Sequence, residues 1–242
     1  MSPGRLFGVG VGPGDPELMT LKAVRAIGDA DVVAWFAKAG NPSNALATAR
    51  AHVRPGAIEV PLLYPVTTEL ARTDPAYVAL IEEFFDRSAA TVASHLDGGK
   101  TVAVLSEGDP LFYGSYMHVH VRLASHYRTD VIPGVTSLSG CWSAAGLPLA
   151  QGDDVLTVVA GTLPESELSR RFRESDALAV IKVGRNLGKI RRALVSAGRL
   201  DRAVYVSRGT MADSRVVALK DKPDDSAPYF AVVLVPCWEA RK

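Results

Sequence analysis

The stretch GVGVGPGDPEL, residues 8–18, joins a short apolar strand to a helix and decides how this chain is interpreted. A dinucleotide-binding turn has the pattern Gly-x-Gly-x-x-Gly, whose backbone N–H groups meet a pyrophosphate. Counted from Gly8, the sixth position is Pro13, which has no N–H. Counted from Gly10, it is Asp15, whose charge repels phosphate. The turn therefore suits a neutral or cationic nucleoside, such as the sulfonium S-adenosylmethionine, better than a diphosphate.

Length and composition indicate a globular protein with a substantial core. The chain has 242 residues, of which 48% are hydrophobic, enough for one large domain or two small ones. Lys and Arg number 27 against 26 Asp and Glu, so we expect no attraction to nucleic acid or to an anionic membrane. No apolar run approaches the roughly 18 residues that span a bilayer. Cys141 and Cys237 form neither a metal-binding nor a disulfide pattern, and we expect a cytoplasmic protein.

Apolar strands alternate with amphipathic helices, which predicts mostly parallel sheets covered on both faces, the α/β class. Gly, Pro and polar residues at 146–154 predict a boundary. We expect an N-terminal α/β domain at residues 1–150 with a mostly parallel sheet. A C-terminal α/β domain with a mixed sheet is expected at residues 151–242.

Several local elements follow from capping residues and periodicity. Asp15 is expected to cap a helix that starts at Pro16, Ser43 to cap another, and Pro75 to open a long helix. A further helix is expected from about Tyr113. The helix from Pro16 should bury an apolar face made of Leu18, Leu21, Val24 and Ile27. The long helix from Pro75 should bury a face made of Val78, Ile81, Phe85, Val92 and Leu96.

The end of the chain has a different pattern. Residues 215–219 and 229–235 have strand character with no helix-length connection between them, so an antiparallel, hairpin-like end is expected. Residues 220–226 are charged and are expected to form a mobile loop.

Three Gly- and Pro-rich turns follow predicted parallel strands, at residues 10–16, 106–110 and 133–137. Open α/β sheets bind their ligands at the carboxyl ends of the strands, and glycine lets the backbone approach a ligand closely. Each turn alone is consistent with an ordinary strand-to-helix connection. Three of them at one edge predict a shared binding site.

These turns resemble the ordered signatures of the tetrapyrrole methyltransferases, namely GVGVGPGDP at 8–16, EGDPLFYGS at 107–115 and PGVTS at 133–137. Three other stretches resemble the branch of that family that methylates C20 of precorrin-2, namely YPVTTE at 64–69, KVGRNLGK at 182–189 and SRGTM at 207–211. The similarity runs along nearly the whole chain. It implies two α/β domains with a cleft between them, a homodimer, and S-adenosylmethionine as the methyl donor.

The resemblance also implies roles for individual residues. The implied donor contacts are Pro13, Glu107, Gly108, Asp109, Phe112, Thr136, Ser137, Val183 and Ser207. Precorrin-2 carries many acetate and propionate arms, which Arg and Lys side chains bind well. The implied substrate contacts are Tyr113, Lys182, Arg185 and Arg208, whereas Arg191 and Arg192 are expected to face solvent. Ser207 departs from this branch, in which Glu often occupies the position.

The implied reaction is an SN2 transfer of a methyl group from sulfur to an electron-rich bridging carbon of the tetrapyrrole. The protein's main task is to align the reactants, which contributes on the order of 7–11 kcal/mol. A proton must then leave the methylated carbon, so a nearby carboxylate is useful. Asp109 is the candidate catalytic base. The favoured interpretation of Asp109 is simpler, a hydrogen bond to the donor or a helix cap.

Other functions stay open at this point. The acceptor could be cobalt-factor II, another corrin carbon, uroporphyrinogen III or a diphthamide precursor. A NAD(P)-dependent oxidoreductase conflicts with Pro13 and Asp15, and a non-catalytic tetrapyrrole carrier would not need the three turns. His118 and His120 lie two apart on a predicted helix and point in different directions, so no metal site is predicted.

Overall fold

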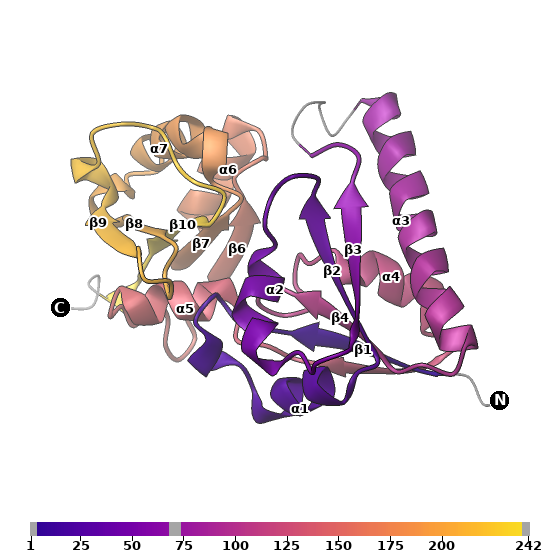
Figure 1. Cartoon of the computed structure of the whole chain (residues 1–242). Coiled ribbons are helices and arrows are strands. Elements are labelled where there is room, and N and C mark those ends of the chain that lie inside the picture. The colour runs from indigo at the N-terminus through magenta and orange to yellow at the C-terminus, as the bar shows by residue number, and fades with distance from the viewer. Residues whose placement is uncertain (1–3, 68–73, 239–242) are drawn as a thin grey trace. The chain divides into compact units, whose positions relative to one another are not determined.

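The computed structural model describes residues 4–67 and 74–238 (Figure 1). Contacts between Cα atoms divide the chain into two compact units, residues 1–136 and 137–242. Two residues of the YPVTTE stretch, Thr68 and Glu69, lie outside the described residues. Within the described ranges, no helix is long and apolar enough to cross a bilayer.

The first unit contains a five-stranded parallel sheet with the strand order β3-β2-β4-β1-β5. Its strands are β1 (Arg5–Gly10), β2 (Val32–Lys38), β3 (Ile58–Tyr64), β4 (Val102–Ser106) and β5 (Arg128–Ile132). Its helical elements are η1 (Pro16–Leu18), α1 (Leu21–Asp29), α2 (Asn44–Ala49), η2 (Arg50–His52), α3 (Pro75–Asp97) and α4 (Tyr116–Leu123).

Alternation along the central strand β4 explains why both faces of this sheet are covered. Val102 and Val104 are buried in one cluster with residues of α3 and α4. Ala103 and Leu105 are buried in the other cluster, with residues of α1 and α2. Successive side chains of a strand point to opposite faces, so a continuous apolar strand produces two cores and three layers.

The predicted caps at Asp15 and Ser43 are confirmed. Asp15 accepts the N–H of Glu17 at 2.9 Å, and Ser43 accepts that of Leu46 at 3.3 Å. The helix expected from Pro16 is wrong in its extent, because extended backbone at Met19 and Thr20 separates η1 from α1.

Because of that break, Leu18 and Leu21 do not belong to one helix, and the periodicity counted from Leu18 does not hold. Leu21, which was expected to be buried, is 75% exposed. Val78, also expected inside, is 49% exposed near the start of α3. Strand β3 was not among the expected elements, and it contains Pro61. An edge strand tolerates proline, since one side of its backbone needs no partner.

The second unit contains a mixed sheet with the strand order β6-β7-β10-β8-β9. Its strands are β6 (Leu156–Ala160), β7 (Ala177–Ile181), β8 (Val204–Ser207), β9 (Arg215–Ala218) and β10 (Ala231–Val235). Its helical elements are α5 (Ser137–Ala144), α6 (Glu165–Glu174), η3 (Gly184–Asn186), α7 (Leu187–Ser196), η4 (Leu200–Arg202) and η5 (Leu219–Asp221). Residues of α6 and α7 pack on one face of this sheet, and residues of α5 pack on the other.

The division between the units lies earlier in the chain than the boundary expected after residue 150. Helix α5 precedes that boundary, yet its Leu138 and Cys141 are buried with strands of the second sheet. The Gly-Leu-Pro punctuation at 146–148 therefore follows α5 within the second unit and does not separate the two units.

The antiparallel end of the second sheet is confirmed, but its pairing differs from the expectation. Strand β9 pairs with β8, and β10 is inserted between β7 and β8, antiparallel to both. The two last strands therefore do not pair with each other. Sequence alone did not reveal that the long connection returns to the middle of the sheet.

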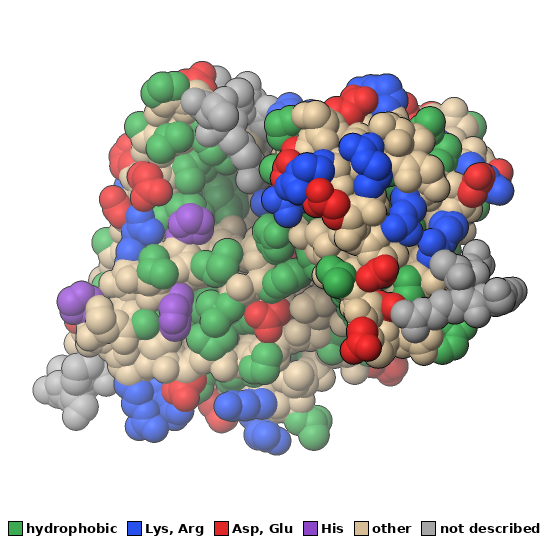
Figure 2. All heavy atoms as spheres, turned by 180° about the vertical axis from the view of Figure 1, so that it is seen from behind, with side chains coloured by type: hydrophobic (Ala, Val, Ile, Leu, Met, Phe, Trp, Pro, Cys, Tyr) green, Lys and Arg blue, Asp and Glu red, His purple; other side chains and the backbone are tan. Residues whose placement is uncertain are grey.

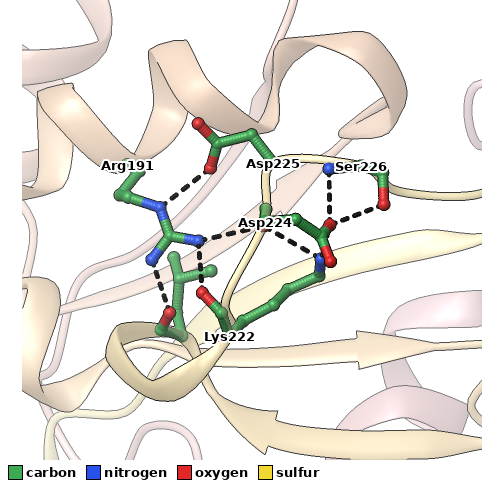
Figure 3. A network of polar contacts seen from close by, with 6 residues as sticks. Arg191, Lys222, Asp224, Asp225 and Ser226 are labelled. Carbon is green, nitrogen blue, oxygen red and sulfur yellow. Dashed lines mark hydrogen bonds and ion pairs between the residues drawn. The ribbon is translucent and has the colours of Figure 1, made fainter.

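Arg191 on α7 holds the connection between β9 and β10, contrary to the expectation that it faces solvent (Figure 3). Its guanidinium donates to the carbonyl oxygens of Leu219 at 2.6 Å, Lys222 at 3.1 Å and Asp224 at 3.2 Å. It also pairs with the Asp225 carboxylate at 2.9 Å. The expectation of a mobile loop at 220–226 is therefore corrected, because one side chain holds this segment at three residues and also holds Leu219 just before it.

Surface charge is mixed. On the face shown in Figure 2, Lys and Arg side chains mostly lie next to Asp and Glu side chains, in line with the formal net charge of +1.

Candidate functional site

The three predicted turns of the first unit lie together at the carboxyl edge of its sheet. Gly12 and Gly108 form an antiparallel bridge, in which the N–H of Gly108 donates to the Gly12 carbonyl at 2.8 Å. The N–H of Gly134 donates to the Asp109 carboxylate at 3.2 Å. The turns after β1, β4 and β5 are therefore linked to one another by hydrogen bonds.

Glycine is required where these turns meet. A Cβ atom on Gly10 would lie 2.6 Å from both the Gly108 carbonyl oxygen and the Gly134 nitrogen. A Cβ atom on Gly134 would lie 2.1 Å from the Gly108 oxygen. Side chains are sterically excluded here, so the junction of the turns is built of closely packed backbone.

Asp109 fastens this junction. One of its carboxylate oxygens accepts the N–H of Leu111 at 2.9 Å, within its own turn. The other accepts the N–H of Gly134, in the turn after β5. Asp109 does not cap a helix, because α4 begins only at Tyr116. A hydrogen bond to the donor and a role as catalytic base both stay predictions.

Glu107 has a contrasting environment. The Asn44 side chain and the backbone N–H of Ala45, at the start of α2, hydrogen-bond to its carboxylate. The residue keeps solvent access, yet burial among the surrounding atoms raises the pKa of its carboxyl to about 7, and the two hydrogen bonds only partly oppose that shift. Sequence reasoning missed the contact with α2, because nothing in the spacing of Asn44 and Glu107 indicates it.

The residues of the junction fit a cationic or neutral nucleoside. The Ser106 hydroxyl, at the end of β4, is buried and has no hydrogen-bond partner within the described residues. A buried unpaired hydroxyl costs about 1–3 kcal/mol, which a polar ligand group or a bound water can recover. The three turns offer backbone groups and the carboxylates of Asp15, Glu107 and Asp109, and their sequences contain no Lys or Arg.

Three residues have a strained backbone at predicted substrate contacts. Among the described residues other than glycine, those with positive φ are Tyr113 (57°), Lys182 (54°) and Arg208 (51°). A left-handed conformation costs a residue with a Cβ roughly 1–2 kcal/mol. Such strain is concentrated at functional sites, so this observation supports a binding role for all three side chains. Tyr113 precedes α4 and does not begin a helix as expected.

Lys182 and Arg208 follow two strands of the second sheet that flank β10. Lys182 comes directly after β7, and Arg208 directly after β8. The Arg208 N–H donates to the Phe230 carbonyl at 2.8 Å, just before β10 begins. Neighbouring strands are about 4.8 Å apart, so the two residues lie on the order of 10 Å from each other at one sheet edge.

The remaining predicted contacts in this unit differ in accessibility. Val183 is fully buried in the core cluster that contains residues of α6 and α7, so neither its side chain nor its backbone has an exposed surface. Ser207 is 6% exposed, whereas Arg185, in η3, is exposed. Ser207 and Arg208 border a cavity of about 440 Å³ beneath residues 221–228, together with Arg215 and Lys222.

Helix α5 is packed tightly against the turn after β8. Ser137, a predicted donor contact, begins the helix and is exposed. One turn later, Cys141 contacts Gly209, where an added Cβ would lie 2.9 Å from the Cys141 sulfur and 3.0 Å from its Cα. Burial raises the pKa of the Cys141 thiol to about 11, so it stays neutral. This contact links the start of α5 to the turn that carries Arg208, and sequence reasoning missed it.

In the described part of the chain, no group of three His, Cys, Asp or Glu side chains could hold a metal ion. His118 stacks on Phe85, with ring centroids 3.8 Å apart, and burial lowers the pKa of its imidazole. The histidine therefore belongs to an aromatic cluster on α3 and α4.

A family model described as Tetrapyrrole (Corrin/Porphyrin) Methylases matches residues 5–222. This chain belongs to that family. A methylase from Sinorhizobium sp, named precorrin-2 C(20)-methyltransferase, is 60% identical over 238 residues, which cover 98% of this chain and 97% of the relative.

Solved structures of methylases share the fold. A cobalt precorrin-4 methyltransferase of cobalamin biosynthesis has a TM-score of 0.72 at 24% identity, over 98% of this chain and 96% of the other. The Thermus thermophilus uroporphyrin-III C-methyltransferase in complex with S-adenosylhomocysteine has a TM-score of 0.67 at 25% identity, over 96% and 92%. The expected fold class, two α/β parts of the tetrapyrrole methylase type, is confirmed, and the expected cleft between them stays a prediction.

Proposed function

We propose that this methylase transfers the methyl group of S-adenosylmethionine to C20 of precorrin-2, giving precorrin-3A in cobalamin biosynthesis. The observation that carries the proposal is the 60% identity, over nearly the whole of both chains, to a protein named for that reaction. The positive φ angles of Tyr113, Lys182 and Arg208 support it independently, because they mark three positions assigned to the substrate.

The donor is proposed to bind at the junction of the three turns in the first unit. Bound S-adenosylmethionine supplies a methyl group activated by the positive charge on sulfur. The backbone of Pro13, Gly108 and Asp109 is available beside Gly10 and Gly134, where no side chain fits. The further proposed donor contacts are Glu107, Phe112, Thr136, Ser137, Val183 and Ser207.

The acidic arms of the substrate are proposed to bind Lys182, Arg185 and Arg208. Arg208 pairs with Asp213 across an exposed surface, with the two side chains 46% and 60% exposed. Exposed ion pairs contribute only about 0–1 kcal/mol, so a substrate carboxylate can displace Asp213 at little cost. Tyr113 is 48% exposed and is proposed to contact the macrocycle.

The assembly and location are also part of the proposal. Resemblance to the family supports a homodimer. Cys141 and Cys237 are both buried and form no disulfide bond within the described residues, which is compatible with a reducing compartment such as the cytoplasm. Size-exclusion chromatography with light scattering tests the dimer.

An acceptor panel tests the reaction. The enzyme is incubated with donor carrying a ¹³C-methyl group and with precorrin-2, its cobalt-bearing equivalent or uroporphyrinogen III. The proposal predicts incorporation of one labelled methyl group into precorrin-2, located at C20 by NMR. Preferred methylation of either other acceptor, or of another carbon, would contradict it.

A further inference from the structure

Tyr64 belongs to the YPVTTE stretch and has no assigned role in binding the donor or the tetrapyrrole. It is the last residue of β3, at the edge of the sheet in the first unit, and it is partly buried. Its ring packs against those of Phe36, Phe84 and Phe85, with centroids 5.9, 4.6 and 6.3 Å away. Aromatic pairs at these distances attract each other, so the ring has a fixed place in the core that includes residues of α3 and α4.

The Tyr64 hydroxyl contacts Ser115, the last residue of the EGDPLFYGS stretch. The two hydroxyl groups form a hydrogen bond between segments that lie 51 residues apart in the chain. Ser115 is the N-cap residue of α4, a position where a serine side chain ordinarily accepts a backbone N–H of the first helical turn. It makes no such cap bond here. The Ser115 hydroxyl therefore joins the start of α4 to the end of β3.

This contact fixes one end of the segment that carries Tyr113. Tyr113 precedes Ser115 by two residues and has the strained φ of 57°. Gly114 lies between them and is packed against its own turn, since an added Cβ would be 3.1 Å from the Pro110 carbonyl oxygen. Asp109 fixes the other end, because its carboxylate accepts backbone N–H groups from two turns. The segment is therefore held at both ends.

Tyr113 presents its ring only while that segment keeps its conformation. The residue is 48% exposed, and its ring meets that of Phe112 edge-on, with centroids 5.0 Å apart. A left-handed backbone in a residue with a Cβ persists where surrounding contacts over-determine it. The hydrogen bond from Tyr64 to Ser115 is such a contact, because it ties the end of the segment to a separate strand.

We propose that Tyr64 is a positioning residue for the tetrapyrrole site. Its hydroxyl acts through Ser115 to keep residues 113–115 in the conformation that presents the Tyr113 ring to the macrocycle. Tyr64 thus serves substrate binding from β3, outside the three turns that are proposed to hold the donor. The inference rests on the proposed function, because it requires a tetrapyrrole bound against Tyr113.

Steady-state kinetics of Tyr64→Phe test the inference, because this change removes the hydroxyl and keeps the ring. Loss of one hydrogen bond that holds the binding conformation should raise KM for precorrin-2 about fivefold. The value of kcat should change less than about twofold, since the lost contact serves binding and not methyl transfer. The Kd of S-adenosylhomocysteine, measured by calorimetry, should stay at the wild-type value, because the Phe112 N–H is held separately by the Asp109 carbonyl at 3.3 Å.

Tyr127→Phe is the matched control. Both tyrosines are partly buried against the same core cluster, and the Tyr127 hydroxyl also makes one hydrogen bond, to the Asp97 carboxylate at 2.8 Å. Asp97 is the last residue of α3 and does not belong to the segment that carries Tyr113. The control should therefore keep the wild-type KM. Ser115→Ala should reproduce the effect of Tyr64→Phe, and combining the two changes should add nothing further.

A Tyr113→Ala background separates positioning from a general loss of structure. If Tyr64 acts through the Tyr113 ring, Tyr64→Phe should raise KM no further once that ring is gone. Fluorine NMR of protein labelled with 3-fluorotyrosine gives a readout without any substrate. The signal that is missing from Tyr113→Phe should shift or broaden in Tyr64→Phe and stay in place in Tyr127→Phe.

The outcomes separate this inference from the proposed function. An unchanged KM in Tyr64→Phe, an equal rise in Tyr127→Phe, or an undiminished rise in the Tyr113→Ala background overturns the inference while the function stands. A Tyr113 fluorine signal that is the same in Tyr64→Phe and wild type overturns it too. If the wild-type enzyme does not methylate precorrin-2, the proposed function fails, and the inference fails with it.

Discussion

Replacing Gly134 by alanine tests the junction of the three turns most severely. The added Cβ would lie 2.1 Å from the Gly108 carbonyl oxygen and 2.9 Å from the Gly10 Cα. Both neighbours are backbone, so neither can turn aside, and two turns must separate. Forced overpacking costs about 1–3 kcal/mol, and loss of the Gly134–Asp109 hydrogen bond adds about 1 kcal/mol. We therefore expect a fall of about 2–4 kcal/mol in unfolding free energy.

The same separation should remove the backbone groups proposed to hold the donor. We expect Gly134→Ala to bind S-adenosylhomocysteine at least about tenfold more weakly, measured by calorimetry, with stability measured by urea unfolding. Gly28→Ala is the matched control, since its Cβ would meet only the His52 carbonyl at 3.8 Å, and alanine favours the helix α1. Wild-type stability and affinity in Gly134→Ala would refute the reasoning.

Three further predictions concern strain, the Arg191 contacts and pH. Lys182→Gly and Arg208→Gly relieve left-handed backbone strain and should each raise the unfolding free energy by about 1 kcal/mol. Each variant should also raise KM for the tetrapyrrole. Lower stability in urea unfolding would contradict this prediction. Arg191→Met should lower the unfolding free energy by about 2–4 kcal/mol, because it loses the contacts with residues 219–225. The control Arg192→Met loses one exposed ion pair with Glu165 and should lower it by at most about 1 kcal/mol. Equal losses in the two variants would refute a stabilising role for Arg191. The raised pKa of Glu107 means that the folded state binds more protons than the unfolded state between about pH 4.5 and 7, so the unfolding free energy should fall as pH rises through that window. In thermal unfolding, Glu107→Gln should lose this pH dependence of stability. An unchanged pH profile in the variant would contradict the raised pKa of Glu107.

The fold was largely accessible from sequence because strand and helix periods are local properties. The caps at Asp15 and Ser43 and the start of α3 at Pro75 follow from side-chain chemistry within a few residues. Edge strand β3 and the insertion of β10 between β7 and β8 depend on partners far along the chain. No local pattern encodes those partners.

Some contacts of the candidate site could be predicted from the sequence, and others could not. Glycines in the three turns predicted their convergence, since close backbone approach leaves a compositional sign. Three other contacts join segments far apart in the chain and have no such sign in the sequence. They are Glu107 with Asn44, Cys141 with Gly209, and Arg191 with residues 219–225. The Arg191 contact overturned an expectation, because a cation on a predicted helix is most often solvated.

A crystal structure of this methylase with bound S-adenosylhomocysteine tests the location of the donor site most directly. The account predicts ligand density against the backbone of Pro13, Gly108 and Asp109. Density for a fully occupied ligand elsewhere, with that junction filled only by water, would contradict it.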